Sequence, residues 1–110
     1  MAKKAREAFD AAQQGEAIVF VPAIVLAEFF YLNAKLGQPM DFATVFAQLL
    51  EAEQFSFVPF SAVQVLLFER VGRDLEMHDA IVASTAYRLD ACVLTRDHSI
   101  AAEGAVETVW

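Results

Sequence analysis

The stretch HDAIVASTAYRLDACVLTRD, residues 78–97, decides the fold of this chain. Its pattern predicts a helix over His78–Leu89 and, after a short turn, a buried strand over Ala91–Thr95. A helix that leads into a parallel strand begins at the sheet edge where that strand ends, because the two run in opposite directions. Asp79 and Asp97 are therefore expected to meet at the carboxyl edge of the sheet, where open α/β sheets bind ligands.

The composition limits the architecture and the partners. The chain has 110 residues, of which 57% are hydrophobic and ten are phenylalanine. This length suits a single domain, residues 1–110. The apolar content indicates either helices and strands that are buried throughout or an apolar surface that a partner covers. The net charge of −7 disfavours a broad phosphate-binding face, although a metal ion can offset acids locally.

Strands and helices are expected to alternate along the rest of the chain, which predicts a parallel α/β sandwich. Gly15, Gly37 and Gly72 are placed to end helices. The predicted strands are Ala17–Val21, Phe55–Pro59, Ala91–Thr95 and Val106–Val109. The predicted helices are Lys3–Gln14, Pro22–Leu36, a third that begins after Asp41, Ala62–Val71 and His78–Leu89.

Three local features follow from individual residues. Asp41 is positioned to cap the helix that follows it. Ser61 and Gln64 have the spacing of a capping box for helix Ala62–Val71. The helix over Pro22–Leu36 is apolar almost all round, which predicts that it is buried rather than merely amphipathic.

Neither a membrane segment nor a cysteine site is expected. The run Ala17–Leu32 is apolar, but it contains Pro22 and Glu28 and is shorter than the roughly 20 residues of a spanning helix. The N-terminal residues are basic and amphipathic rather than an apolar leader, so a cytoplasmic protein is the default. The single cysteine, Cys92, lies in a predicted strand, which excludes a disulfide framework and favours a small core residue.

Three acids carry the predicted chemistry. Glu28 lies about 9 Å along the helix that follows strand Ala17–Val21, so it also belongs near the carboxyl edge. The alternative is a separate structural role for each acid: Asp79 stabilised by the helix dipole, and Asp97 opening a turn. Glu28 fits that alternative least, because an acid in an apolar helix is costly unless it is paired or binds a cation. We therefore favour a metal site.

Carboxylates without His or Cys ligands suit Mg²⁺ or Mn²⁺, which lower the pKa of a bound water and hold a phosphodiester. Thr95 can hydrogen-bond a site carboxylate, and Arg96 can meet a substrate phosphate or pair with a nearby acid. His78 and His98 lack ligand spacing, so surface or capping roles are predicted for both. Glu76 is predicted to be one of several solvated loop charges.

The segments VPAIVLAEFFYL, MHDAIVASTAYRLDACVLTRD and VETVW, in this order and strand–helix context, resemble the PIN domain family. They are similar in particular to the bacterial ribonuclease toxins of the VapBC type. The resemblance covers nearly the whole chain and implies a three-layer α/β sandwich with a parallel sheet flanked by helices. It also implies a Mg²⁺- or Mn²⁺-dependent endoribonuclease whose acids are Glu28, Asp79 and Asp97. RNA is then the substrate and an antitoxin protein a partner.

The chain departs from the family pattern at its front. PIN domains begin with an apolar strand that ends in an aspartate, and here Met1 opens directly onto helix Lys3–Gln14. The family's first aspartate has no counterpart, and Asp10, on a helix, cannot take its role. A catalytically silent PIN-fold interaction module is therefore the alternative function.

In the family's sheet the missing strand is the central one, between the strands that correspond to Ala17–Val21 and Ala91–Thr95. Each of these strands would lose a hydrogen-bonded neighbour, and buried unpaired backbone groups are costly. Direct pairing of the two strands would disturb nearly every core contact. We therefore expect self-association, as a homodimer whose interface covers the exposed apolar surface.

Overall fold

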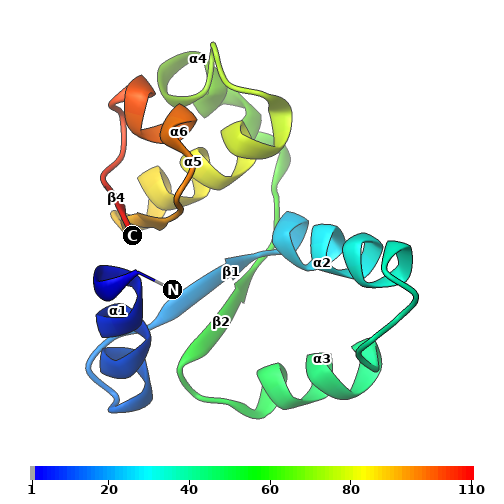
Figure 1. Cartoon of the computed structure of the whole chain (residues 1–110). Helices are drawn as coiled ribbons and strands as arrows, with labels where there is room; N and C mark the ends of the chain where they lie inside the picture. The colour runs from blue at the N-terminus through cyan, green and yellow to red at the C-terminus, as the bar shows by residue number, and fades with distance from the viewer. Residues whose placement is uncertain (1) are drawn as a thin grey trace.

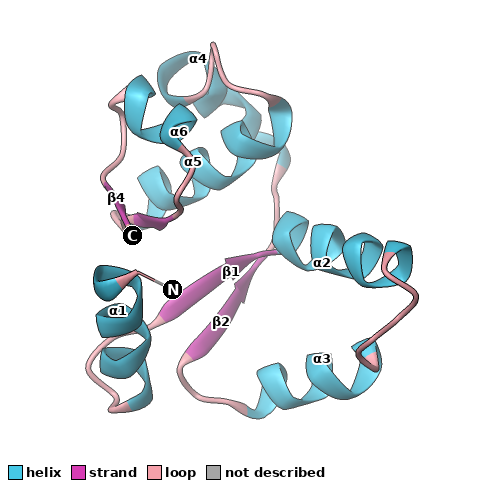
Figure 2. Ribbon diagram, viewed as in Figure 1, coloured by secondary structure: helices cyan, strands magenta, loops and turns pink. Residues whose placement is uncertain are grey.

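The computed structural model describes residues 2–110, in which helices alternate with short parallel strands (Figures 1 and 2). The predicted α/β class is confirmed. The strands are β1 (Val19–Pro22), β2 (Phe55–Val58), β3 (Val93–Leu94) and β4 (Thr108–Val109). The helices are α1 (Lys3–Gln13), α2 (Ala23–Lys35), α3 (Phe42–Glu51), the 3₁₀ helix η1 (Ala62–Leu67), α4 (Phe68–Val71), α5 (Met77–Leu89) and α6 (His98–Glu103).

The strands form two separate sheets rather than one. β1 pairs with β2 in parallel, from Val19 opposite Phe55 to Pro22 opposite Val58. β3 pairs with β4 in parallel through two residues, with Val93 opposite Thr108. Within residues 2–110, β1 and β3 do not pair with each other. Most strands are shorter than the sequence predicted, because each has a hydrogen-bonded neighbour on one side only.

Helix α5 forms the centre of the best-packed region. Its inward face carries mostly small side chains, and this lets neighbouring elements approach closely. Gly72, which follows α4, shows how close they come: a Cβ atom added there would lie 2.7 Å from the Cβ of Ala80. The buried residues of α5 are Ala80, Ile81, Ala83, Ser84, Thr85 and Ala86.

Gln64 is a buried polar residue that connects η1 to α5. Its amide Nε2 lies within hydrogen-bond distance of Ile81 O (3.1 Å), Ser84 Oγ (2.8 Å) and Thr85 Oγ1 (2.7 Å). The predicted capping box with Ser61 is wrong, because Ser61 makes no side-chain cap. The first turns after Ser61 are 3₁₀ rather than α-helical, and Gln64 is fully buried against α5.

Helix α1 is joined to the C-terminal end of the chain. The backbone N–H groups of Lys4 and Ala5 donate to the carbonyl of Trp110, at 3.1 and 3.2 Å. This places α1 beside β4, as Figure 1 shows. Helix α1 thereby satisfies part of its free amino end without a side-chain cap.

Helices α2 and α3 form a more open region with β1 and β2. The prediction that α2 is buried is wrong: Asn33 is its one buried residue, and Tyr31 is 72% exposed. No other element covers the outer face of α2 in the described chain (Figure 1). Aromatic rings fill the inner side in edge and stacked pairs, namely Phe29 with Phe42, Phe30 with Phe42, Phe42 with Phe46, and Phe46 with Phe57.

The connection between α2 and α3 is held by the side chain of Asn33, which bonds to the backbone of Met40. Asn33 Nδ2 donates to Met40 O at 2.8 Å, and Met40 N donates to Asn33 Oδ1 at 3.1 Å. Asp41 lies at the N-cap of α3, but its side chain makes no cap hydrogen bond to the backbone. Its carboxylate instead accepts the hydroxyl of Thr44 at 2.6 Å, so the predicted side-chain cap is wrong.

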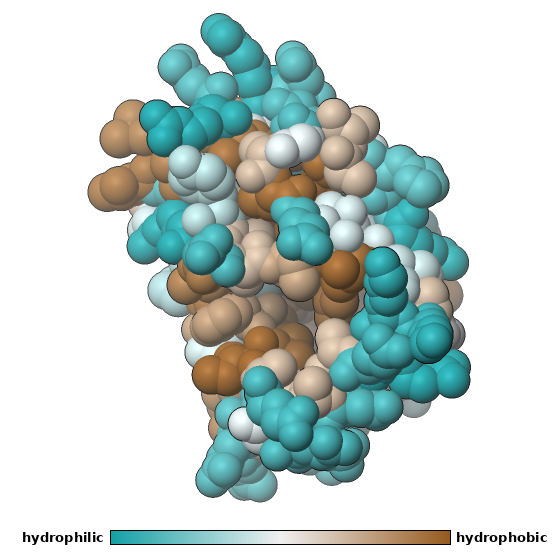
Figure 3. Space-filling model, turned by 90° about the vertical axis from the view of Figure 1, so that its left-hand side faces the viewer, coloured by the Kyte–Doolittle hydropathy of each residue, from teal (hydrophilic) through white to brown (hydrophobic). Residues whose placement is uncertain are grey.

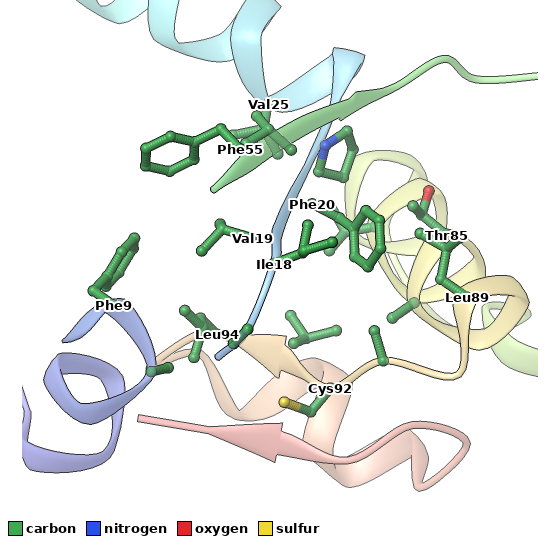
Figure 4. Close-up of a pocket in the computed structure, with 18 of the residues that line it drawn as sticks. Phe9, Ile18, Val19, Phe20, Val25, Phe55, Thr85, Leu89, Cys92 and Leu94 are labelled. Carbon is green, nitrogen blue, oxygen red and sulfur yellow. The ribbon is translucent and has the colours of Figure 1, made fainter. Parts of the chain in front are cut away.

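An apolar groove of about 610 Å³ separates the two sheets. Apolar side chains gather over the middle of this face of the molecule (Figure 3), and Phe9, Ile18, Leu89 and Leu94 surround the space in the close-up (Figure 4). Cys92, predicted to be a small core residue, is exposed and lines the groove. Cys92 directly precedes β3, which pairs only with β4 among the described residues, so no strand covers its side chain on the groove side.

Candidate active site

The three predicted acids lie where strands lead into helices. Asp97 is the N-cap of α6, just after β3, and Asp79 is in the first turn of α5. Glu28 is on α2, which follows β1 directly. Each acid therefore lies in the helix or turn in which the sequence predicted it.

Asp79 and Asp97 lie close enough to influence each other. The pKa of Asp79 is raised, first because partial burial removes water from its carboxylate, and then by the negative charge of Asp97. The charge of Glu76 also raises it, and His78 opposes the shift. The negative charge of Asp97 thus connects two of the three predicted acids, which lie at the starts of the contacting helices α5 and α6.

Asp97 responds in the opposite direction. Its pKa is lowered mainly because its carboxylate accepts the backbone N–H of Ser99, at 2.9 Å, and secondly by the Ser99 hydroxyl. Asp97 therefore opens the short helix α6, as one reading of the sequence predicted. Within the pair, Asp79 takes up the first proton as the pH falls, while Asp97 stays ionised.

Glu28 makes a different contact. Its Oε2 lies 3.7 Å from Nδ1 of His78, and half of its side chain is exposed to solvent. Of the two ways predicted to offset the cost of an acid in this helix, a partner or a cation, the structure shows a partner, His78, together with exposure to water. Glu28 therefore contacts His78, the residue that precedes Asp79, and no contact with Asp79 itself is seen.

Glu76 and His78 take part in this cluster, although the sequence interpretation left them outside it. Glu76, predicted as a solvated loop charge, caps α5 by accepting the backbone N–H of His78 at 3.2 Å. His78 Nδ1 is 3.9 Å from Glu76 Oε1 and 3.7 Å from Glu28 Oε2. His78 thus lies between a carboxylate of α2 and the N-cap carboxylate of α5. The available signal was the position of Glu76 immediately before the helix, but glutamate is not among the usual N-cap residues.

Thr95 and Arg96 flank the acidic pair. The hydroxyl of Thr95 accepts the backbone N–H of Asp97 at 3.0 Å, so it fixes the backbone of the site rather than its carboxylate. Arg96 is exposed, and the ion pairs found among residues 2–110 both involve His78 instead. The guanidinium of Arg96 is therefore open to solvent beside Asp97.

The carboxylates of the site have the right chemistry for a divalent ion, but too few of them lie together. Carboxylate oxygens are the ligands that Mg²⁺ and Mn²⁺ prefer. Across the described chain, however, no three His, Cys, Asp or Glu side chains are gathered closely enough to hold a metal. The structure supplies the pair Asp79 and Asp97, with Glu28 turned to His78, and we assign no catalytic step to a metal in this arrangement.

A comparison with protein-family models identifies the family of the chain. A family model described as PIN domain matches residues 1–103, which include all three acids. No curated protein matches the chain. Between residues 2 and 110, the structure has no helix with the length and apolar character needed to cross a membrane.

Proposed function

The chain belongs to the PIN domain family, whose members are generally nucleases, and on this premise we propose that it is an endoribonuclease that uses Mg²⁺ or Mn²⁺. The similarity of its segments to VapBC-type toxins leads us to propose further that it is the toxin of a toxin–antitoxin pair. Its partners would then be RNA and an antitoxin protein. The observation that supports the proposal is the placement of Asp79 and Asp97 at the starts of α5 and α6, two helices that contact each other.

The flanking residues take supporting roles in this proposal. Asp79 and Asp97 would hold the ion, which when bound offsets the charge of a phosphodiester and polarises a water. Thr95 keeps the backbone of Asp97 in place through its 3.0 Å hydrogen bond. The exposed guanidinium of Arg96 is suited to an RNA phosphate, because a fork of N–H donors matches phosphate oxygens. Glu28 would join the pair only by leaving His78.

A cleavage assay tests the proposal. The purified chain is incubated with structured RNA and Mn²⁺, with EDTA as the control, and compared with Asp79→Asn and Asp97→Asn. Asparagine keeps the side-chain shape and, at Asp97, the capping ability, so folding is preserved. We expect metal-dependent cleavage that falls at least about 100-fold in either variant, as is common when a group needed in the transition state is removed.

Asp74→Asn is the matched control, because Asp74 is an exposed acid outside the cluster. It is expected to cleave RNA like the unaltered chain. Cleavage that survives EDTA, or that is equal in all three variants, would contradict the assignment of Asp79 and Asp97.

The lack of a third gathered donor favours a second candidate, a catalytically silent PIN-fold interaction module. Here the acids are structural and the exposed apolar surface serves an antitoxin peptide or a second copy in a homodimer. Calorimetry with Mn²⁺ separates the two candidates. A nuclease is expected to bind the ion and to lose that binding in Asp79→Asn, whereas the module gives no heat of binding and no cleavage in a folded sample.

A further inference from the structure

We propose that a pocket between α4 and α5 holds an unpaired guanine base of the RNA. The pocket has a volume of about 340 Å³ and is lined by residues of α4, of the link that follows it, and of the first turn of α5. It shares no residue with the groove between the two sheets. This inference rests on the proposed nuclease function and adds to it the base that the site recognises.

The walls of the pocket are mostly apolar. Phe68 contributes an aromatic ring, and aromatic side chains are the platforms on which proteins commonly stack unpaired bases. Met77 is 60% exposed, and its flexible side chain can close over a flat ligand. The volume lies at the small end of the range for ligand pockets, so it suits a single base rather than a larger ligand.

Two charged side chains, Glu69 and Arg73, also line the pocket. Their spacing of four residues would pair them on a continuous helix, but α4 ends at Val71. Both ion pairs found among residues 2–110 involve His78, and neither Glu69 nor Arg73 has a side-chain hydrogen bond within that part of the chain. The carboxylate and the guanidinium are therefore both available to a ligand.

Guanine is the base that best satisfies an acid and a guanidinium together. Its N1–H and N2–H₂ groups are adjacent donors, and one carboxylate accepts from both. Its O6 and N7 atoms are adjacent acceptors, and the fork of an arginine donates to both. Adenine and cytosine each offer a carboxylate one amino group, and uracil offers one ring N–H. These three bases would therefore pair with Glu69 less completely.

The pocket lies beside the turn that carries Asp79. Met77 and Ala80 line the pocket, and the helix rises only about 4.5 Å between them. Asp79 belongs to the same turn and lies on another side of it. RNA that crosses the amino end of α5 can therefore place one base in the pocket and a neighbouring phosphodiester at Asp79.

The charge of the chain increases the importance of base contacts. Phosphate contacts supply much of the affinity of most proteins for nucleic acids. With a net charge of −7, this chain gains little from them. Contacts to bases must then contribute more of the binding free energy, and such contacts also carry sequence information. We therefore expect cleavage next to guanine rather than at every phosphodiester.

Binding of short RNA in the absence of metal tests the proposal. The probes are fluorescent uridine hexamers whose third residue is guanosine, adenosine, cytidine or uridine, in a buffer that contains EDTA. Anisotropy is expected to show that the guanosine hexamer binds at least about tenfold more tightly than the all-uridine hexamer. Two analogues remove single groups of the base: inosine lacks the N2 amino group, and 7-deazaguanosine lacks N7. Each is expected to bind at least about threefold more weakly than guanosine.

Variants of the protein connect each group of the base to its partner. Glu69→Ala is expected to abolish the difference between guanosine and inosine, and Arg73→Ala the difference between guanosine and 7-deazaguanosine. Both side chains are exposed, so the fold should tolerate their loss. Asp74→Ala and Arg70→Ala are the matched controls, because these residues are exposed and do not line the pocket. Both controls are expected to keep both differences.

Three results would overturn the proposal. Equal binding of the guanosine and uridine hexamers, or no binding, by a sample that circular dichroism shows to be folded would mean that the pocket recognises no base. Tightest binding of the adenosine or cytidine hexamer would mean that it recognises a different one. Differences between guanosine and its analogues that persist in Glu69→Ala and Arg73→Ala would place the base elsewhere.

The binding assay contains no metal, so its outcome is independent of cleavage. Preference for guanosine without cleavage in Mn²⁺ would contradict the nuclease proposal and leave the pocket in place. Metal-dependent cleavage without any preference for guanosine would contradict the pocket alone.

Discussion

Residues 62–109 and residues 19–58 form two halves that are packed very differently. The packed half, 62–109, contains a buried cluster of Ala83, Ala86, Val93 and Ile100 around α5. The open half, 19–58, is richer in phenylalanine, yet Asn33 is its only residue in the buried class. Small side chains on closely approaching helices exclude water completely, whereas large rings do so only when another layer covers them. Apolar content alone is thus a poor guide to burial.

The largest stability loss is expected at the polar centre of the packed half. Gln64→Ala removes a fully buried amide whose nitrogen is within hydrogen-bond distance of Ile81 O and of the hydroxyls of Ser84 and Thr85. A cavity and unpaired groups together are expected to cost about 2–4 kcal/mol in the free energy of unfolding. Urea denaturation measures it. Gln48→Ala, on the exposed side of α3, is the control and should change little; equal losses would mean that the packed half is not special.

The close approach of Gly72 to Ala80 gives the next effect. Gly72→Ala places a methyl group 2.7 Å from the Cβ of Ala80, and overpacking of this kind is expected to cost about 1–3 kcal/mol. In a double-mutant cycle, Ala80→Gly should recover part of this loss beyond its own helix penalty. Strictly additive effects would place the two residues farther apart than described here.

A smaller loss is expected in the open half. Phe46 stacks on Phe42 and on Phe57 at 6.0 and 5.6 Å between ring centroids, but it is only half-buried. Phe46→Ala is therefore expected to cost about 1–2 kcal/mol rather than the roughly 3–5 kcal/mol of a fully buried ring. Thermal denaturation checks this. A loss equal to that of Gln64→Ala would show that something covers the rings in solution.

The smallest effect concerns pH and the acidic pair. The folded-state pKa of Asp79 is raised, so its contribution to stability is present in acid and is lost as the pH rises through that pKa. Asp79→Asn should therefore stabilise the metal-free protein at neutral pH, with a gain that vanishes below the ordinary range of a carboxyl group. Asp97 acts oppositely: its pKa is lowered, so its contribution is lost only in stronger acid. Melting temperatures that are unchanged by Asp79→Asn at every pH would contradict the raised pKa of Asp79.

The sequence predicted the order of helices and strands and the positions of the acids, because apolar periodicity and strand–helix succession are local properties. The sequence-based predictions were wrong where the burial of a residue depends on which elements pack against it. The apolar helix over Pro22–Leu36 was expected to be buried, but burial requires a neighbour that the helix itself does not encode. Gln64 was assigned to a cap because its spacing from Ser61 is right, and only the 3₁₀ turn sends it inward. The contact of Glu28 with His78 joins α2 to α5, and such a contact between distant segments is not encoded by local periodicity.

Amide hydrogen exchange of the free protein tests the two-sheet arrangement most directly. The amides of Val19, Val93 and Thr95 donate to neighbouring strands or to the segments beside them, whereas those of Phe20 and Leu94 face the groove. The arrangement predicts slow exchange in α5, intermediate exchange at the paired strand amides, and fast exchange at Phe20 and Leu94. The contradicting result is equal protection at Phe20 and Leu94 and at Val19 and Thr95 in a monomeric sample. It would show that β1 and β3 have further strand neighbours, contrary to the two-sheet arrangement.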